Sequence, residues 1–186
     1  MPNLAVFIDR DGTLNEDPGY LSDPAEVVLY PDTGEALALL KKYGFLLIVI
    51  SNQSGIARGL MTAKEVDAVN DRINFYLGEY KVKIDAFYYC PAHPDFSSEE
   101  ECKCRKPSPK LLFDAASEFN VDLQKSYFIG DTATDIECGK NAGIKTILVR
   151  TGKGEESFSI LQKENNFPTF VADNLLNASK FILGDI

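Results

Sequence analysis

The sequence predicts an α/β fold in which a mostly parallel sheet is covered by helices on both faces. Short apolar runs of strand length alternate with helical patterns along the whole chain, as in β-α-β units. No repeat, low-complexity stretch or linker interrupts this alternation, so we expect residues 1–186 to form one domain. Open sheets of this kind bind ligands beyond the carboxyl ends of their strands. The residues that follow each strand are therefore the first candidates for function.

Local patterns define the expected elements. Strands are expected over 4–8, 45–50, 84–89, 126–129, 145–149 and 169–172. Helices are expected over 35–43, 62–80, 108–119 and 134–142, and from residue 173 onward. Gly44 is a C-terminal cap, Thr62 and Glu65 form a capping box, and Pro109 occupies the first position of a helix. Residues 90–108 are expected to be a loop, because they hold three prolines and a run of charges.

The composition is that of an acidic globular chain. Its 186 residues include 19 basic and 28 acidic ones, which gives a net charge of −9. This balance argues against nonspecific binding to nucleic acids or anionic membranes, but a local patch can still bind a small anion. No apolar run approaches the ~20 residues of a membrane span, and the first residues lack a signal-peptide pattern. We therefore expect a cytoplasmic protein with no nucleic-acid or membrane partner.

Carboxylates follow the first and fourth expected strands. Asp9 and Asp11 leave the first strand two residues apart, and two such charges need a cation or a shared proton. Mg²⁺ fits, because it is a hard ion held by one or two carboxylates and by substrate oxygens. Asp131 follows the fourth strand and would face the same crevice. The alternatives are a simple turn at residues 9–13 and a helix cap provided by Asp131 or Thr132.

Polar and basic residues follow the second and third expected strands. The segment 51–55 reads Ser-Asn-Gln-Ser-Gly and suits phosphate oxygens, although such a loop is a weak signal alone. Arg58 could add positive charge there, although a solvated arginine is the commoner case. Lys106 lies just before a helix and would offset the charge of nearby carboxylates and a phosphate. The alternative is that Arg105 and Lys106 form an exposed basic pair.

A cluster of cysteines marks the segment between the third and fourth strands. Four cysteines could form two disulfides in a secreted protein, but three of them lie here beside the only histidine. In a cytoplasmic chain this predicts a closed, structural zinc site with the ligands Cys90, His93, Cys102 and Cys104. The alternative is reduced, buried cysteines and a surface histidine. Cys138 is expected to be an ordinary buried residue.

Four short motifs together resemble the haloacid dehalogenase superfamily. They are Asp9-x-Asp11-x-Thr13, Ser51, Lys106 and Gly130-Asp131, in the family's order and each at the expected strand or helix end. The resemblance covers nearly the whole chain and implies a three-layer α/β/α, Rossmann-like fold. An aspartate two positions after the first one is typical of the phosphatases of this superfamily. No large insertion separates the motifs, so we expect an open site without a sizeable cap domain.

The resemblance also implies a role for each motif residue. Asp9 would be the nucleophile that forms an aspartyl-phosphate, and Asp11 the general acid and base. Ser51 and Lys106 would hold the transferring phosphoryl group. Mg²⁺ would be bound by Asp131, the carboxylate of Asp9 and the backbone carbonyl of Asp11.

Further segments resemble the group of this superfamily that hydrolyses heptose bisphosphate and histidinol phosphate. By this resemblance the substrate would contact Asp17, Pro18, Gly19, Tyr20, Ser51, Asn52, Gln53, Ser54, Arg105, Lys106 and Thr132. Arg105 would recognise the distal phosphate. The group's zinc histidine usually stands two residues after the first cysteine, where this chain has Ala92. We assign the ligand to His93, one residue later.

The expected activity is Mg²⁺-dependent hydrolysis of the 7-phosphate of D-glycero-D-manno-heptose 1,7-bisphosphate, in the synthesis of nucleotide-activated heptose. The partner would be this small sugar bisphosphate, and the enzyme would be a monomer. Histidinol phosphate is the alternative substrate, disfavoured by the long spacer between His93 and Cys102. A non-catalytic scaffold built around the zinc loop is a third possibility, and the intact Asp9 and Asp11 argue against it.

Overall fold

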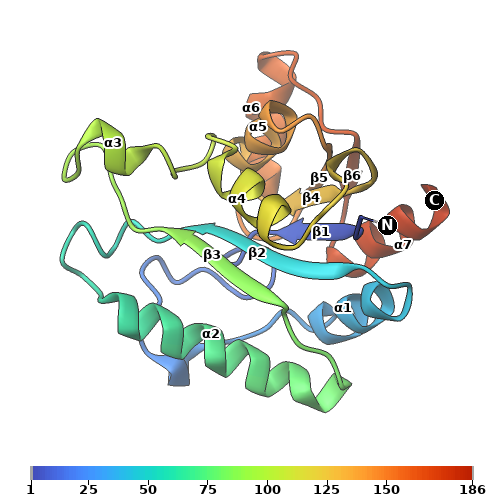
Figure 1. Cartoon of the computed structure of the whole chain (residues 1–186), viewed down its shortest axis with the longest axis horizontal. Helices are drawn as coiled ribbons and strands as arrows, with labels where there is room; N and C mark the ends of the chain where they lie inside the picture. Colours follow the sequence, from blue (N-terminus) through green and yellow to red (C-terminus); the bar gives the residue numbers. More distant parts are fainter. Residues whose placement is uncertain (1, 186) are drawn as a thin grey trace.

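The computed structural model describes residues 2–185 and is built on one six-stranded sheet (Figure 1). The strands are β1 (Ala5–Ile8), β2 (Leu46–Asn52), β3 (Ala86–Cys90), β4 (Tyr127–Gly130), β5 (Lys145–Val149) and β6 (Phe170–Ala172). Their order is β3-β2-β1-β4-β5-β6, and every neighbouring pair is parallel. From β1 the chain adds β2 and β3 on one side and then β4, β5 and β6 on the other. The connections after β1 and β4 therefore lead to opposite sides, and a crevice opens where these two strands end.

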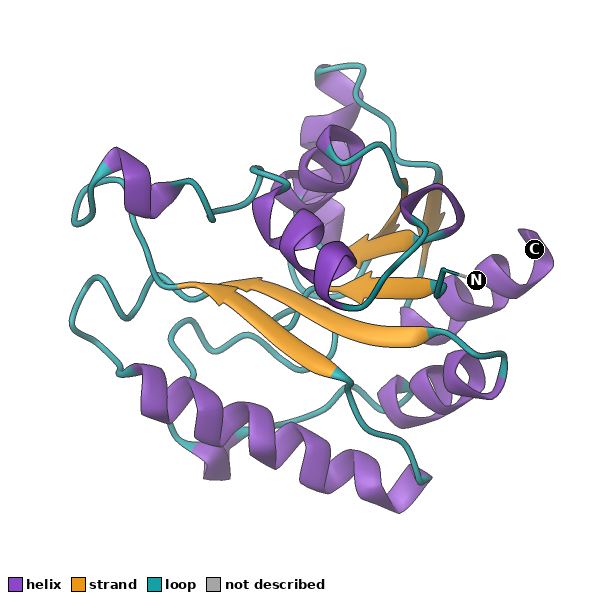
Figure 2. Ribbon diagram, in the orientation of Figure 1, coloured by secondary structure: helices purple, strands orange, loops and turns teal. Residues whose placement is uncertain are grey.

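Helices cover both faces of the sheet (Figure 2). They are α1 (Thr33–Lys42), α2 (Ala63–Leu77), α3 (Glu99–Cys102), α4 (Lys110–Glu118), α5 (Ala133–Asn141), α6 (Gly154–Lys163) and α7 (Leu175–Asp185). The short 3-10 helices are η1 (Pro24–Glu26), η2 (Gly78–Tyr80) and η3 (Leu123–Lys125). Helices α1, α2 and α7 pack on one face, and α4, α5 and α6 on the other. The predicted three-layer α/β/α fold is confirmed.

Strand β1 shows why the sheet needs two covering layers. Val6 and Ile8 belong to the apolar core under α1, α2 and α7, whereas Ala5 and Phe7 belong to the core under α4 and α5. All four side chains are fully buried. Because successive side chains of a strand point to opposite faces, a strand covered on both faces must be apolar at every position.

The predicted elements agree with the structure apart from two helices. All six strands are present, and Thr62 and Glu65 form the expected capping box at the start of α2. Helix α6 was not predicted, because Leu161 is its only fully buried apolar side chain and its helical pattern is therefore weak. Helix α3 lies inside the expected loop, where Ser98 and Glu101 form a further capping box. Pro109 stands one residue before α4 rather than at its first position.

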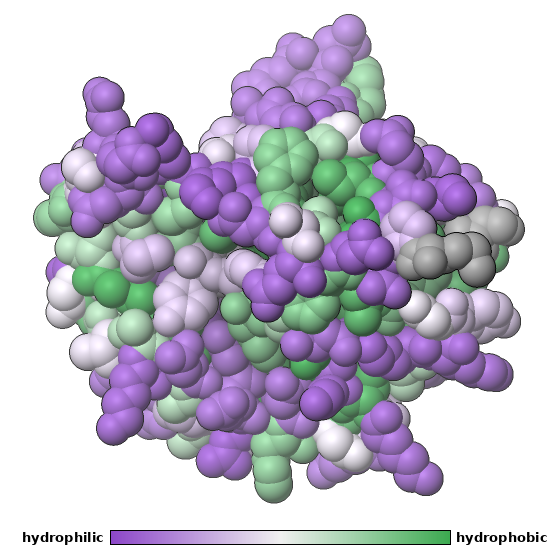
Figure 3. Space-filling model, viewed as in Figure 1, coloured by the Kyte–Doolittle hydropathy of each residue, from purple (hydrophilic) through white to green (hydrophobic). Residues whose placement is uncertain are grey.

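The segments that join strands to helices carry no large insertion. Within residues 2–185, the connection from β1 to α1 holds only η1, and the connection from β3 to α4 holds only α3. This agrees with the expected lack of a cap domain. On the face shown in Figure 3, hydrophilic side chains cover the projecting α3 and the top of the molecule, and apolar patches lie nearer the centre. None of the helices in the described range has the length and apolar character that crossing a membrane requires.

Candidate active site

A cleft of about 230 Å³ opens at the carboxyl ends of β1, β2, β4 and β5. Its base is formed by Asp9, Lys106 and Asp131, and Asp11 also lines it. The predicted substrate residues that line the cleft are Asp17, Gly19, Tyr20, Asn52, Gln53, Ser54, Arg105, Lys106 and Thr132. Pro18 and Ser51 are not among the lining residues. The structure thus brings together, at one end of the sheet, predicted residues from Asp9 to Thr132, which lie 123 positions apart in the chain.

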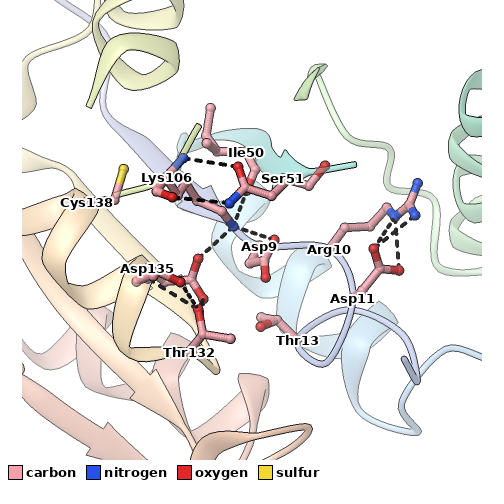
Figure 4. A network of polar contacts seen from close by, with 12 residues as sticks. Asp9, Arg10, Asp11, Thr13, Ile50, Ser51, Lys106, Thr132, Asp135 and Cys138 are labelled. Carbon is pink, nitrogen blue, oxygen red and sulfur yellow. Dashed lines mark hydrogen bonds and ion pairs between the residues drawn. The ribbon is translucent and has the colours of Figure 1, made fainter. Parts of the chain in front are cut away.

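Lys106 is the buried cation at the centre of the site (Figure 4). Its Nζ lies 2.7 Å from Asp9 Oδ1 and 2.6 Å from Asp135 Oδ1, and it donates a hydrogen bond of 3.0 Å to the Ile50 carbonyl oxygen. Burial works against the charged form, but the carboxylates of Asp135 and Asp9 hold the pKa of Lys106 above its ordinary value. The lysine is therefore charged and fixed beside Asp9, as the motif assignment requires.

Three carboxylates surround this lysine. Oxygens of Asp9, Asp131 and Asp135 lie within 4.8 Å of one another, and all three residues are buried. Burial and the charge of Asp135 raise the pKa of Asp131 to about 6, and the same two causes raise the pKa of Asp9 well above its ordinary value. One ammonium group does not balance three carboxylates. Their donor set and their uncompensated charge fit a hard divalent cation such as Mg²⁺.

The Asp11 carboxylate is held apart from this group. It accepts hydrogen bonds from Arg10 Nη2 at 2.9 Å, Asn15 Nδ2 at 3.0 Å and Gln53 Nε2 at 2.9 Å. Although burial raises the pKa of Asp11, the charge and hydrogen bonds of Arg10 lower it below its ordinary value. Asp11 was predicted to contact the metal through its backbone carbonyl, not through this carboxylate. The third carboxylate of the side-chain cluster is that of Asp135.

Asp135 is a site residue that the sequence argument did not assign. Its Oδ2 accepts hydrogen bonds from the backbone N–H of Thr132 at 2.9 Å and from the Thr132 hydroxyl at 2.6 Å. These contacts form a capping box at the start of α5, while the other oxygen of Asp135 pairs with Lys106. Thr132, a predicted substrate residue, therefore also caps the helix. The three-residue spacing between Thr132 and Asp135 indicates the helix cap, but it does not indicate the ion pair with Lys106.

The carboxyl end of β2 supports Lys106 from the other side. The side chain of Asn52 accepts a hydrogen bond from the Lys106 backbone N–H at 3.0 Å and donates one to the Lys106 carbonyl oxygen at 3.3 Å. Ser51 is buried, and its hydroxyl accepts a hydrogen bond from Gln53 Nε2 at 3.3 Å. Asn52 thus holds the backbone of Lys106 in addition to lining the cleft.

The loop after β5 was also missed. The backbone N–H of Lys153 donates a 2.8 Å hydrogen bond to Asp131 Oδ2, and Lys153 Nζ lies 3.3 Å from Asp17 Oδ2. Gly152 has a φ of +55°, and a Cβ there would come within 2.3 Å of Asp131 Oδ2. Only glycine fits this position. The rule that ligands bind at strand ends would have pointed to this loop, since it directly follows β5.

The predicted zinc site has no support in the structure. Cys90 and Cys104 are joined by a disulfide, and Cys102 is free. His93 does not face them: its Nε2 lies 2.7 Å from Arg58 Nη2. Ala92, which stands where the family's zinc histidine is usual, is buried in the apolar cluster that also includes the three cysteines. Within residues 2–185, the aspartates described above are the only trio of metal-ligating side chains. Cys138 is buried, as predicted.

The fold and this site define a class of protein. A Rossmann-like sheet whose first strand ends in two aspartates two positions apart, next to a buried lysine and a cluster of carboxylates, is that of a haloacid dehalogenase-type hydrolase. The family model described as HAD-hydrolase-like matches residues 103–178.

Similar proteins specify the family. The chain is 44% identical to a D-glycero-D-manno-heptose-1,7-bisphosphate 7-phosphatase of Chlorobaculum tepidum, over 96% of this chain and 94% of that protein. It is 37% identical to a D-glycero-beta-D-manno-heptose-1,7-bisphosphate 7-phosphatase of Pasteurella multocida, over 97% of each chain. A D,D-heptose 1,7-bisphosphate phosphatase of B. bronchiseptica, solved with magnesium and phosphate, has a TM-score of 0.88 and 29% identity over 98% of this chain and 99% of that one. The chain belongs to the family of heptose-1,7-bisphosphate 7-phosphatases.

Proposed function

We propose that this chain removes the 7-phosphate from D-glycero-D-manno-heptose 1,7-bisphosphate and releases heptose 1-phosphate and inorganic phosphate. The observation that carries the proposal is the arrangement of Asp9, Lys106 and Asp131 at the base of the cleft, with Arg105 on its wall. The names of the relatives support this substrate. The product keeps a phosphate on its anomeric carbon, which is the group that nucleotide activation requires. We place the reaction in the cytoplasm, in a monomeric enzyme.

The first half of the reaction uses Asp9 as nucleophile. Its carboxylate oxygen attacks phosphorus, the bond from phosphorus to the C7 oxygen breaks, and the phosphoryl group passes to Asp9. Asp11 gives its proton to the leaving C7 oxygen. Because Arg10 lowers the pKa of Asp11 in the free protein, this proton is taken up with the substrate, whose phosphate charge favours the protonated carboxyl.

The second half returns the enzyme to its starting state. Asp11, now ionised, takes a proton from water, and the hydroxyl oxygen attacks the phosphorus of the aspartyl-phosphate. The bond between phosphorus and the Asp9 oxygen breaks, which frees inorganic phosphate and restores the carboxylate. Lys106 and Ser51 hold the phosphoryl oxygens throughout. A Mg²⁺ ion held by Asp9 and Asp131, next to Asp135, would supply the charge neutralisation that phosphoryl transfer needs.

Phosphate release from a small substrate panel tests this proposal. The panel contains heptose 1,7-bisphosphate and histidinol phosphate, each with Mg²⁺ and each with a chelator. We expect release from the heptose bisphosphate, a much lower rate on histidinol phosphate, and none with Asp9→Asn. No release by the native protein, or faster turnover of histidinol phosphate, would contradict the proposed substrate.

A further inference from the structure

The segment 17–20 forms part of the cleft wall but has few contacts of its own to hold it there. Asp17, Gly19 and Tyr20 line the cleft, and all four residues of the segment are exposed. Within residues 2–185, the backbone of this segment forms no hydrogen bond to another backbone group. Its Gly19 N–H donates to Asp17 Oδ1 at 2.8 Å, a contact inside the segment itself. Side chains must therefore fix this wall against the neighbouring loops.

Two side-chain contacts do so, one at each end of the segment. At one end, the ring of Tyr20 packs on Gly55, where a Cβ would come within 2.8 Å of the ring. At the other end, Asp17 Oδ2 lies 3.3 Å from Lys153 Nζ. Gly55 belongs to the connection after β2 and Lys153 to the connection after β5, and these strands lie on opposite sides of β1. The ion pair is thus the attachment of the segment to the β5 side.

Lys153 provides a fixed base for this attachment. Its backbone N–H donates to Asp131 Oδ2 at 2.8 Å, and its carbonyl oxygen accepts a hydrogen bond from the Ser157 N–H at 2.9 Å. In the same loop, the Thr151 hydroxyl donates to the Gly12 carbonyl oxygen at 2.7 Å. The Lys153 side chain is 63% exposed, so it contributes little to the core. A rigid backbone therefore carries an ammonium group whose contact is with Asp17.

The ion pair also decides the charge that a substrate meets on this wall. An unpaired Asp17 carboxylate lining the cleft would repel the phosphate groups of an anionic sugar. Lys153 offsets this charge, and together with the Gly19 N–H it fixes both oxygens of the carboxylate. Each carboxylate oxygen has a further lone pair, which can accept a hydrogen bond from a sugar hydroxyl.

We propose that Lys153 is a positioning residue, which holds Asp17 and with it the segment 17–20 in the orientation that binds the heptose. Lys153 acts through Asp17 and does not itself bind a phosphate group. This inference rests on the proposed function, because it assigns the segment 17–20 to binding of the sugar bisphosphate.

Steady-state hydrolysis of heptose 1,7-bisphosphate by native protein, Lys153→Met and Lys153→Arg tests the inference. For Lys153→Met we expect KM to rise about 5- to 20-fold while kcat changes less than about twofold, because Asp9 and Asp11 keep their contacts. The lost exposed ion pair accounts for up to about fivefold, and repulsion between Asp17 and the substrate for the rest. Lys153→Arg keeps the charge and should stay within about threefold of the native KM.

A double-mutant cycle separates positioning from direct binding. Because Lys153 acts through Asp17, adding Lys153→Met to Asp17→Asn should raise KM by less than about a further twofold. A lysine that binds a substrate phosphate directly would cause the full loss in both backgrounds. That result, or an unchanged KM for Lys153→Met alone, would overturn the inference while the proposed function stands.

Lys145→Met is the matched control. Lys145 is also an exposed lysine paired with an aspartate, Asp185, but it lies at the amino end of β5, away from the cleft. We expect its kinetics to match those of the native protein, and a KM increase equal to that of Lys153→Met would also overturn the inference. If Lys153→Met does not fold, Lys153→Gln takes its place in every comparison. Failure of the native protein to hydrolyse the bisphosphate would instead refute the proposed function, and this inference with it.

Discussion

The substitution Asp131→Asn tests the electrostatic account of the metal site in the metal-free protein. Burial and Asp135 raise the pKa of Asp131 from 3.8 to about 6. At ~1.4 kcal/mol for each pKa unit, the ionised carboxylate lowers the free energy of unfolding by about 3 kcal/mol at pH 7. The amide of the variant carries no charge and so removes this penalty. It has one acceptor oxygen, whereas Asp131 accepts hydrogen bonds from the Lys153 N–H and the Thr13 hydroxyl with two, so one hydrogen bond of about 1 kcal/mol is lost. We therefore expect a net stabilisation of about 2 kcal/mol.

The pH dependence has a definite sign. Because the pKa of Asp131 is higher in the folded than in the unfolded state, the folded protein binds more protons between these two values. The native protein should therefore gain stability from this group as the pH falls through about 6 toward about 4. The advantage of Asp131→Asn should shrink over the same range.

Urea unfolding with a chelator at pH 7 and pH 4.5 measures both effects, and a repeat with Mg²⁺ completes the test. Mg²⁺ should stabilise the native protein and have little effect on Asp131→Asn. The control is Asp114→Asn, an exposed aspartate on α4 that pairs with Lys110, for which we expect a change below about 0.5 kcal/mol. The reasoning is refuted if Asp131→Asn destabilises the metal-free protein at pH 7, or if Mg²⁺ stabilises both proteins equally.

Two further substitutions test the parts of the site that hold these carboxylates. Lys106→Met removes the ammonium that pairs with Asp9 and Asp135, so the free energy of unfolding should fall by about 3–5 kcal/mol in urea titrations; an unchanged value would contradict the role of this buried cluster. Gly152→Ala places a Cβ against the metal-site carboxylate, so Mg²⁺ affinity, measured by calorimetry, should fall about 10-fold or more. The control is Gly143→Ala: Gly143 also has a positive φ, but a Cβ there would lie 3.8 Å from its nearest neighbour, so Mg²⁺ affinity should not change. Equal effects of the two substitutions would contradict the role of Gly152 beside Asp131.

The sequence predicted the strands and the motif residues because both depend on local signals. A strand covered on both faces is apolar at every position, and β1 could be located from this alone. Asp9 and Asp131 could be placed because parallel strands bring their carboxyl ends together, and Lys106 because it stands just before a helix. Each of these signals is carried by a few neighbouring residues.

The remaining features depend on contacts between distant segments. The role of Asp135 follows from its pairing with Lys106, 29 positions earlier in the chain. Ala92 is buried in the apolar cluster that includes the cysteines, and residue spacing does not show this. The contact between His93 and Arg58 joins two loops that are 35 positions apart. Spacing alone grouped the histidine with the cysteines, whereas packing separates them.

The central claim is that Asp9 removes the 7-phosphate, and phosphorus NMR of the reaction products tests it most directly. Heptose 1,7-bisphosphate is incubated with Mg²⁺ and either native protein or Asp9→Asn. The account predicts that the native protein converts the 7-phosphate signal into inorganic phosphate and leaves the anomeric 1-phosphate signal intact. It also predicts that Asp9→Asn produces no change, because the amide is not a nucleophile for phosphorus. Loss of the 1-phosphate signal, or normal turnover by Asp9→Asn, would contradict it.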